Sequence, residues 1–200
     1  LAPVDIRDCF TLTIHAFNLA ERFRCPVFLA SNKEIGMTRE TVDLDAVEKP
    51  PVIERKLHTS GPYLPFGLRD GTDVPDFLPI GGAIPVRQTS STHGPTGFIT
   101  TDPVEIQTSV ERLQRKIESQ IESISFFDLE EAAGAETLII TCGVTARAAR
   151  VAARRAMEDA GKHVSLLVLK TLWPVPERVI TDAARKARRV LVVEMNLGQM

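Results

Sequence analysis

A short turn, Cys142-Gly143-Val144-Thr145-Ala146-Arg147, contains residue types that could hold an anion. Glycine allows a tight backbone turn, threonine can cap a helix, and the free N–H groups at a helix start attract negative charge. A cation in the first helical turn opposes the helix dipole, so a nearby anion would explain Arg147. Gly143, Thr145 and Arg147 could therefore bind a phosphate, a carboxylate or an acidic partner. We favour a simpler alternative, a capped helix whose Arg147 forms a structural salt bridge.

A second polar turn follows an apolar run near the end of the sequence. Glu194 ends the run VLVVE, and Asn196 and Gly198 come directly after it. A buried carboxylate without a partner costs free energy, so Glu194 needs backbone amides or a neighbouring subunit. Glu194, Asn196 and Gly198 could therefore face a partner. We expect the sequence to be a piece of a longer polypeptide whose later residues complete this site.

Both turns need a scaffold of strands and helices. Three apolar runs, AETLIITCG, HVSLLVLK and VLVVE, alternate with two helical patterns, the first of which ends at Gly161. Strands that are apolar along their whole length and alternate with helices are typical of a buried parallel sheet with right-handed crossovers. Ligands bind at the carboxyl ends of such strands, which is where the two turns stand. We therefore predict an α/β fold for residues 134–200, a parallel sheet with flanking helices.

The first hundred residues predict a different organisation. Residues 1–32 contain a helical pattern and then the apolar run PVFLAS at 26–31, which predict a helix and a buried strand that end a second α/β domain. Residues 33–101 are predicted to be an irregular crossing segment, because 9 of the 13 prolines and 8 of the 12 glycines fall between residues 36 and 103. We expect only short strands there, near residues 83–88 and 97–100.

Residues 102–133 are predicted to form a strap helix and a linker. Asp102 is suited to the N-cap, Pro103 to the first helical position, and Glu105 to the capping box. Apolar residues then recur at helical spacing as far as Ile124. They form one narrow stripe, which predicts a helix packed by that face.

Composition excludes several classes of function. The net charge of −2 gives no electrostatic reason to expect nucleic acid or an anionic membrane as a partner. Cys9, Cys25 and Cys142 are far apart in the sequence, and no CxxC is present. We therefore expect no iron–sulfur or other metal site within this chain. The three cysteines are interpreted as buried thiols of a cytoplasmic protein. His93 is in a loop rich in polar groups, but a surface histidine is the favoured interpretation.

Five segments carry a resemblance to a known family. In order along nearly the whole chain, they resemble the α subunit of 2-oxoacid:ferredoxin oxidoreductases, particularly the 2-oxoglutarate type. The segments are LAPVDIRDCFTLTIHAFNLAERFRCPVFLAS, STHGPTGFITTDP, TCGVTARAARVA, LKTLWPVPE and VEMNLGQM. The last part also resembles the C-terminal domain of transketolase.

The resemblance implies a role for each part of the chain. Residues 1–32 would be the C-terminal part of the domain that binds the pyrimidine end of thiamine diphosphate. Residues 134–200 would be a truncated transketolase-C-like domain that supports assembly. The whole enzyme would be a cytoplasmic hetero-oligomer with a β subunit, which oxidatively decarboxylates a 2-oxoacid, here 2-oxoglutarate, to acyl-CoA and reduces ferredoxin.

The resemblance also implies that the cofactors lie mainly outside this chain. Thiamine diphosphate and Mg²⁺ would be held by the β subunit and by residues before Leu1, and an iron–sulfur cluster by a partner or another region. Coenzyme A would be a co-substrate. No catalytic residue is carried over, and we expect the chain alone to be inactive. One alternative is a non-catalytic docking module that binds coenzyme A or another anion. Another is a transketolase or dehydrogenase E1 component, but the long Pro/Gly-rich segment argues against this second alternative.

Overall fold

The computed structural model describes residues 1–69 and 71–199, which form two compact units. The sheet unit combines Leu1–Phe17, Val27–Pro51 and Ile121–Met200. The strap unit combines Asn18–Pro26 and Val52–Gln120. No helix among the described residues is long and apolar enough to cross a membrane.

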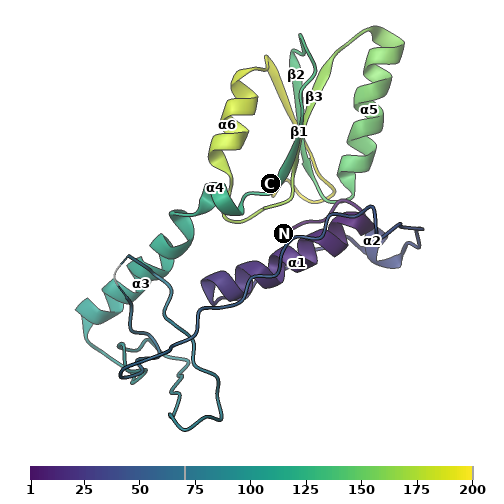
Figure 1. The fold of residues 1–200 in the computed structure, drawn as a ribbon. Coiled ribbons are helices and arrows are strands. Elements are labelled where there is room, and N and C mark those ends of the chain that lie inside the picture. Colours follow the sequence, from purple (N-terminus) through teal and green to yellow (C-terminus); the bar gives the residue numbers. More distant parts are fainter. Residues whose placement is uncertain (70, 200) are drawn as a thin grey trace. The chain divides into compact units, whose positions relative to one another are not determined.

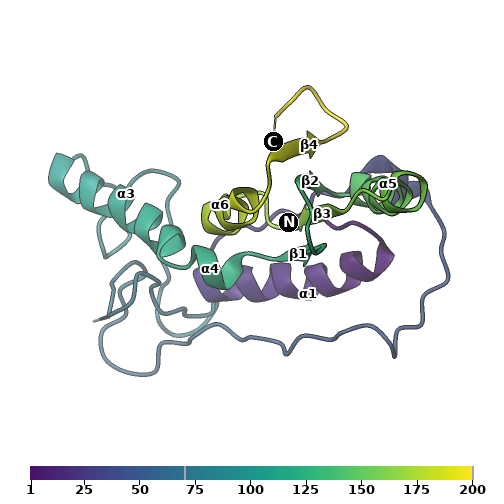
Figure 2. The same ribbon diagram turned by 90° about the horizontal axis from the view of Figure 1, so that it is seen from above.

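The sheet unit is built on the parallel sheet that the sequence predicts. Strands β2 (Thr137–Cys142), β3 (Val164–Leu169) and β4 (Arg189–Val193) run parallel to one another. A fourth strand, β1 (Phe127–Glu130), was not predicted, and it pairs antiparallel with β3. The order across the sheet is β1-β3-β2-β4. Helices α5 (Thr145–Ala160) and α6 (Glu177–Arg185) cover opposite faces of the sheet (Figures 1 and 2).

Two apolar layers form the core of the sheet unit. Successive residues of a strand point to opposite faces, so strands that are apolar throughout supply both layers. The layer on the α5 side contains alanines of that helix, whose small side chains let the helix lie close to the sheet, and the layer on the α6 side contains Ala183. The strand residues are Ile139, Leu166 and Val168 in the first layer and Leu138, Ile140, Leu167 and Leu169 in the second.

Strand β4 forms as predicted but is not buried. All five of its residues are exposed, including the four apolar residues at 190–193. The reason is its position, because β4 is an edge strand that pairs only with β2 among the described strands. The apolar pattern predicts burial, but the described part of the chain places no layer over this strand.

Helix ends follow the predicted capping chemistry at two positions. Gly161 is the C-cap of α5, with a left-handed φ of 62°, and its N–H contributes to the closing turn. Asp102 caps α3 (Pro103–Glu118), accepting from the backbone N–H of Val104 at 2.8 Å and of Glu105 at 3.0 Å. The predicted strap helix is interrupted, however, because α3 ends at Glu118 and a separate short helix α4 (Ile121–Ile124) follows.

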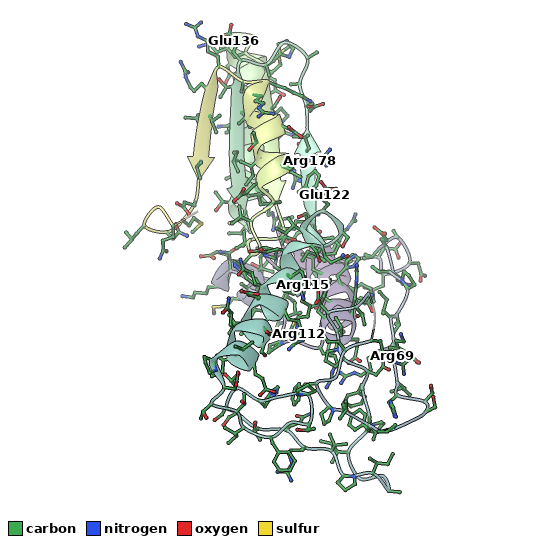
Figure 3. The ribbon with its side chains drawn as sticks, turned by 90° about the vertical axis from the view of Figure 1, so that its left-hand side faces the viewer. Arg69, Arg112, Arg115, Glu122, Glu136 and Arg178 are labelled. Carbon is green, nitrogen blue, oxygen red and sulfur yellow. The ribbon has the colours of Figure 1, made fainter. Side chains whose placement is uncertain are left out.

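Helix α4 belongs to the sheet unit and is tied to α6 at the surface. Arg178 of α6 and Glu122 of α4 form an ion pair and lie next to each other in Figure 3. The two remaining helices are α1 (Ile6–Phe23), whose last residues belong to the strap unit, and α2 (Lys33–Met37).

Three strand predictions in the first hundred residues are wrong. Residues 26–31 are extended but form no strand, because among the described residues their backbone bonds only to Leu1, through the Phe28 carbonyl and the Ala30 N–H. Residues 83–88 and 97–100 also form no strand. A single bridge, His93 with Ile99, is the only ladder contact found there among the described residues. Frequent proline and glycine leave these segments without a continuous partner.

Candidate functional site at the carboxyl ends of the parallel strands

The two turns singled out in the sequence lie at one edge of the sheet. Gly143 follows β2 and Glu194 follows β4, and these strands are parallel neighbours. The Thr141 hydroxyl donates to the Val193 carbonyl at 2.8 Å, which ties the two strand ends together. In Figure 1 this edge is the lower end of the sheet, opposite the turn that leads from α5 into β3. The topology therefore brings both predicted turns to the place where parallel sheets bind ligands.

Asn32 occupies the start of α5. Its side-chain oxygen accepts from the Val144 backbone N–H at 2.8 Å. The predicted cap from Thr145 is wrong, because Val144 is the N-cap and no side chain of this turn caps the helix. Gly143 has a left-handed φ of 57°, and a Cβ there would overlap the Asn32 side-chain oxygen. The group that could have received an anion is thus used within the chain.

Arg147 also has a partner within the chain. Its Nη1 atom lies 2.6 Å from the Glu40 carboxylate. The two side chains are 52% and 29% exposed, so the pair is worth at most about 1 kcal/mol. Arg147 therefore forms the structural salt bridge that the sequence analysis favours over an anion site.

The end of β3 carries a more buried charge cluster. Lys170 Nζ lies 2.9 Å from Asp8 and 3.0 Å from Asp128, and the lysine side chain is only 15% exposed. Burial opposes the lysine charge, but hydrogen bonds to the two carboxylates outweigh it and raise the pKa of Lys170. This cluster joins α1, β1 and the end of β3, so its role is to hold the sheet unit together.

The turn after β4 lies beside Cys142. Glu194 is half-buried, and Gly198 has a φ of 74° that suits a glycine turn, whereas Asn196 is exposed. Burial, and then the Glu194 carboxylate, raise the pKa of the Cys142 thiol. A thiol with a raised pKa stays protonated near neutral pH and is a poor nucleophile.

Large apolar side chains are exposed at the same edge of the sheet. Trp173, in the turn after β3, is 75% exposed, and Leu197, in the turn after β4, is 96% exposed. Met195 is also exposed. Apolar groups of this size at a strand-end edge are typical of contact with another protein surface. Neither Trp173 nor Leu197 was predicted as a site residue, although a tryptophan within a proline-rich turn is a usable signal.

Two further residues of this edge, Asn32 and Glu40, could not be found from the sequence. They lie 112 and 107 positions from their partners Val144 and Arg147. Among the described residues no group of three histidine, cysteine, aspartate or glutamate side chains could hold a metal ion. The edge therefore offers internal hydrogen bonds, one buried charge cluster and an apolar surface.

Two family models match the chain. One, described as "Pyruvate flavodoxin/ferredoxin oxidoreductase, thiamine diP-bdg", matches residues 1–112. The other, "Pyruvate:ferredoxin oxidoreductase core domain II", matches residues 135–200. Together they confirm the resemblance on which the sequence analysis relies.

Similar proteins agree with these matches. The chain is 34% identical over 205 residues to 2-oxoglutarate synthase subunit KorA of Methanothermobacter marburgensis and 31% identical over 204 residues to the same-named subunit of Methanocaldococcus jannaschii. In each case all of this chain and 53% of the relative are covered, so the chain spans about half the length of these curated relatives.

A solved structure has the same fold. It is the 2-oxoglutarate:ferredoxin oxidoreductase from Magnetococcus marinus with 2-oxoglutarate, coenzyme A and succinyl-CoA bound. The match covers 99% of this chain and 35% of the chain in that structure, with a TM-score of 0.86 and 24% sequence identity. The chain belongs to the pyruvate flavodoxin/ferredoxin oxidoreductase family.

Proposed function

We propose that this chain is part of the α subunit of a thiamine-diphosphate-dependent 2-oxoacid:ferredoxin oxidoreductase. The enzyme would oxidatively decarboxylate 2-oxoglutarate to an acyl-CoA and pass the electrons to ferredoxin. Full-chain similarity to subunits named 2-oxoglutarate synthase supports the reaction and the substrate. A family model whose description includes thiamine diphosphate supports the cofactor, and a structural neighbour with coenzyme A bound supports the co-substrate.

Within this enzyme, the chain has a structural and subunit-assembly role. The observation that carries this proposal is the hydrogen bond from the Val144 N–H to Asn32, because it closes the helix start that a ligand would otherwise use. The exposed Trp173, Leu197 and β4 residues support contact with a partner surface, for which the β subunit is the candidate. The turns at Gly143, Thr145 and Arg147 and at Glu194, Asn196 and Gly198 would then be scaffold and partner-facing elements of a cytoplasmic hetero-oligomer.

The described residues do not fit a complete cofactor site. A diphosphate bound through Mg²⁺ needs several oxygen ligands that converge on one point. No such group of acidic or histidine side chains exists in the described part of the chain, and the start of α5 is already capped. We propose that thiamine diphosphate, Mg²⁺ and the iron–sulfur cluster are held mainly by the β subunit or another region. When bound, thiamine diphosphate supplies the carbanion chemistry of decarboxylation.

An activity assay tests this division of labour. The 200-residue chain is assayed alone and again in the full α subunit together with the β subunit, with 2-oxoglutarate, coenzyme A and ferredoxin. We expect turnover only in the assembled enzyme. Turnover of 2-oxoglutarate by the isolated chain would contradict the proposal.

The alternative of a module that binds coenzyme A through Arg147 gains no support from the structure, because Arg147 is paired with Glu40. Calorimetry with coenzyme A, comparing the natural chain with Arg147→Ala, tests it directly. We expect the two proteins to give the same heat. Binding that the substitution abolishes would restore the alternative.

A further inference from the structure

A cavity of about 310 Å³ in the strap unit has an unusual charge distribution. Its wall contains three cations, Arg24 just after α1 and Arg112 and Lys116 on α3. No aspartate or glutamate is part of this wall among the described residues. We call this cavity the basic pocket.

Two of the three cations are almost fully buried, and their hydrogen bonds go to neutral groups. Arg112 and Lys116 are only 9% and 7% exposed. Arg112 Nη1 donates to the Asp73 carbonyl at 3.0 Å, and Lys116 Nζ donates to the Phe23 carbonyl at 2.8 Å. A carbonyl satisfies one donor but leaves the charge, and an arginine has five donors and a lysine three. Both side chains therefore keep charge and donor capacity.

Arg24 is held in the same way. Its Nη1 atom donates to the carbonyls of Asp76 at 2.8 Å, Pro75 at 3.0 Å and Pro65 at 3.3 Å. The Asp76 carboxylate pairs instead with Arg69, outside the wall of the basic pocket. The Asp76 carboxylate thus has another cation as its direct partner.

The pocket cations repel one another. Burial lowers the pKa of Lys116, Cys25 opposes this change, and the Arg112 and Arg24 charges lower the pKa further. Burial likewise lowers the pKa of Arg112, although Asp73 opposes this change. Like charges close together in a poorly solvated site are costly, so an anion that binds between them would gain the energy of relieving this repulsion.

The rest of the wall is rich in hydroxyl groups. The consecutive residues 89–92, Thr-Ser-Ser-Thr, lie in this wall together with Ser109 of α3. His93 also lines the pocket, stacked on Phe66 with ring centroids 3.4 Å apart. Its Nδ1 atom is buried and has no hydrogen-bond partner among the described residues.

We propose that the basic pocket binds the phosphate group of a small phosphate monoester. A phosphate dianion matches three cations better than a carboxylate does, and its oxygens accept from arginine, lysine and hydroxyl donors. The volume of the pocket lies at the lower end of the range for small-molecule sites, which leaves room for an organic group beside the phosphate. The inference uses only contacts within the strap unit and does not depend on the proposed enzymatic reaction.

Ser109→Glu provides the main test. A carboxylate at this position of the wall would neutralise the cations, so we expect the fold to be kept, but it would repel a phosphate. Thr108→Glu is the matched control, because it adds the same charge to an exposed neighbouring position of α3 outside the pocket wall.

Calorimetry at low ionic strength would use inorganic phosphate, glycerol 3-phosphate and succinate as probes. We expect glycerol 3-phosphate to bind most tightly, and Ser109→Glu to weaken it by a factor of about ten or more, the value of one charged hydrogen bond. The Thr108→Glu control should stay within about two-fold of the natural chain, since surface charges are screened.

Other outcomes distinguish the sources of the anion. Binding of inorganic phosphate without the monoester would overturn the monoester and leave free phosphate as the ligand. Succinate binding as tightly as phosphate would overturn the preference for phosphate. An absence of heat with all three probes, or an equal loss in Ser109→Glu and Thr108→Glu, would remove the site altogether.

Discussion

Substitution of Gly143 by alanine tests whether Asn32 organises the start of α5. Gly143 has a φ of 57°, and a Cβ at this position would overlap the Asn32 oxygen that accepts from Val144. An alanine must therefore adopt a left-handed backbone and also displace the Asn32 side chain. Both effects destabilise the sheet unit, and they can be separated because only the second one requires Asn32.

The size of the effect follows from these two parts. An alanine in the left-handed region costs about 1 kcal/mol or slightly more. Loss of the bond between Asn32 and the helix start costs about another 1 kcal/mol. Gly143→Ala should therefore lower the free energy of unfolding by about 2–3 kcal/mol, which for a chain of this length corresponds to a Tm lower by about 5–10 °C.

A double-mutant cycle isolates the contact. Asn32→Ala alone should cost about 1 kcal/mol, and Gly143→Ala added to it should then cost only the backbone strain, again about 1 kcal/mol. Gly36→Ala is the control, because a Cβ there meets no atom within 4 Å and no positive φ is imposed. Urea unfolding followed by circular dichroism gives the free energies, and hydrogen exchange at Val144 reports the bond. Strict additivity of the two substitutions, with unchanged exchange at Val144, would refute the reasoning.

Three further predictions concern single side chains. Lys170→Met should lower stability by about 2 kcal/mol, because Asp8 loses its ion-pair partner and Asp128 keeps only Arg150. Since the pKa of Lys170 is raised in the folded state, the difference from the natural chain should shrink as the pH rises above about 10, which urea melts at neutral and alkaline pH would show. Asp102→Ala should cost about 1 kcal/mol through loss of the α3 cap, whereas Asp102→Asn should cost much less; equal losses in thermal melts would argue against capping. Arg24→Gly should relieve the strain of a left-handed backbone (φ 48°), which is worth about 1 kcal/mol, but it removes hydrogen bonds to three carbonyls, which together are worth more. The strap unit should therefore be cut faster in limited proteolysis. Slower cleavage would contradict this prediction.

Local chemistry accounts for the elements that the sequence predicts correctly. Strands β2 and β3 are mostly apolar and become largely buried, Gly161 ends α5, and Asp102 begins α3. Each of these features depends on residues a few positions apart, so the pattern alone is sufficient. Burial of β4 is the exception, because burial depends on which neighbours cover a strand and not on its own composition.

The geometry of the candidate site depends on contacts between residues far apart in the sequence, which no local pattern predicts. The turn at Gly143, Thr145 and Arg147 is visible in the sequence, but its occupation by Asn32 and Glu40 joins residues more than a hundred positions apart. An anion site and a capped helix start share the same residue types, so only the tertiary structure could decide between them.

The sequence by itself determined the parallel α/β sheet, the main helix ends and the resemblance to 2-oxoacid:ferredoxin oxidoreductases, because strand composition, capping residues and ordered segments are local properties of the chain. The tertiary structure alone decided where charges meet. It placed Arg24 beside Arg112 and Lys116, and it gave His93, which reads as an ordinary loop histidine, a buried nitrogen without a partner in the described chain. The physical reason is that electrostatic interactions depend on distance in space. Folding brings together residues that are far apart in the sequence, so their separation along the chain does not predict that distance.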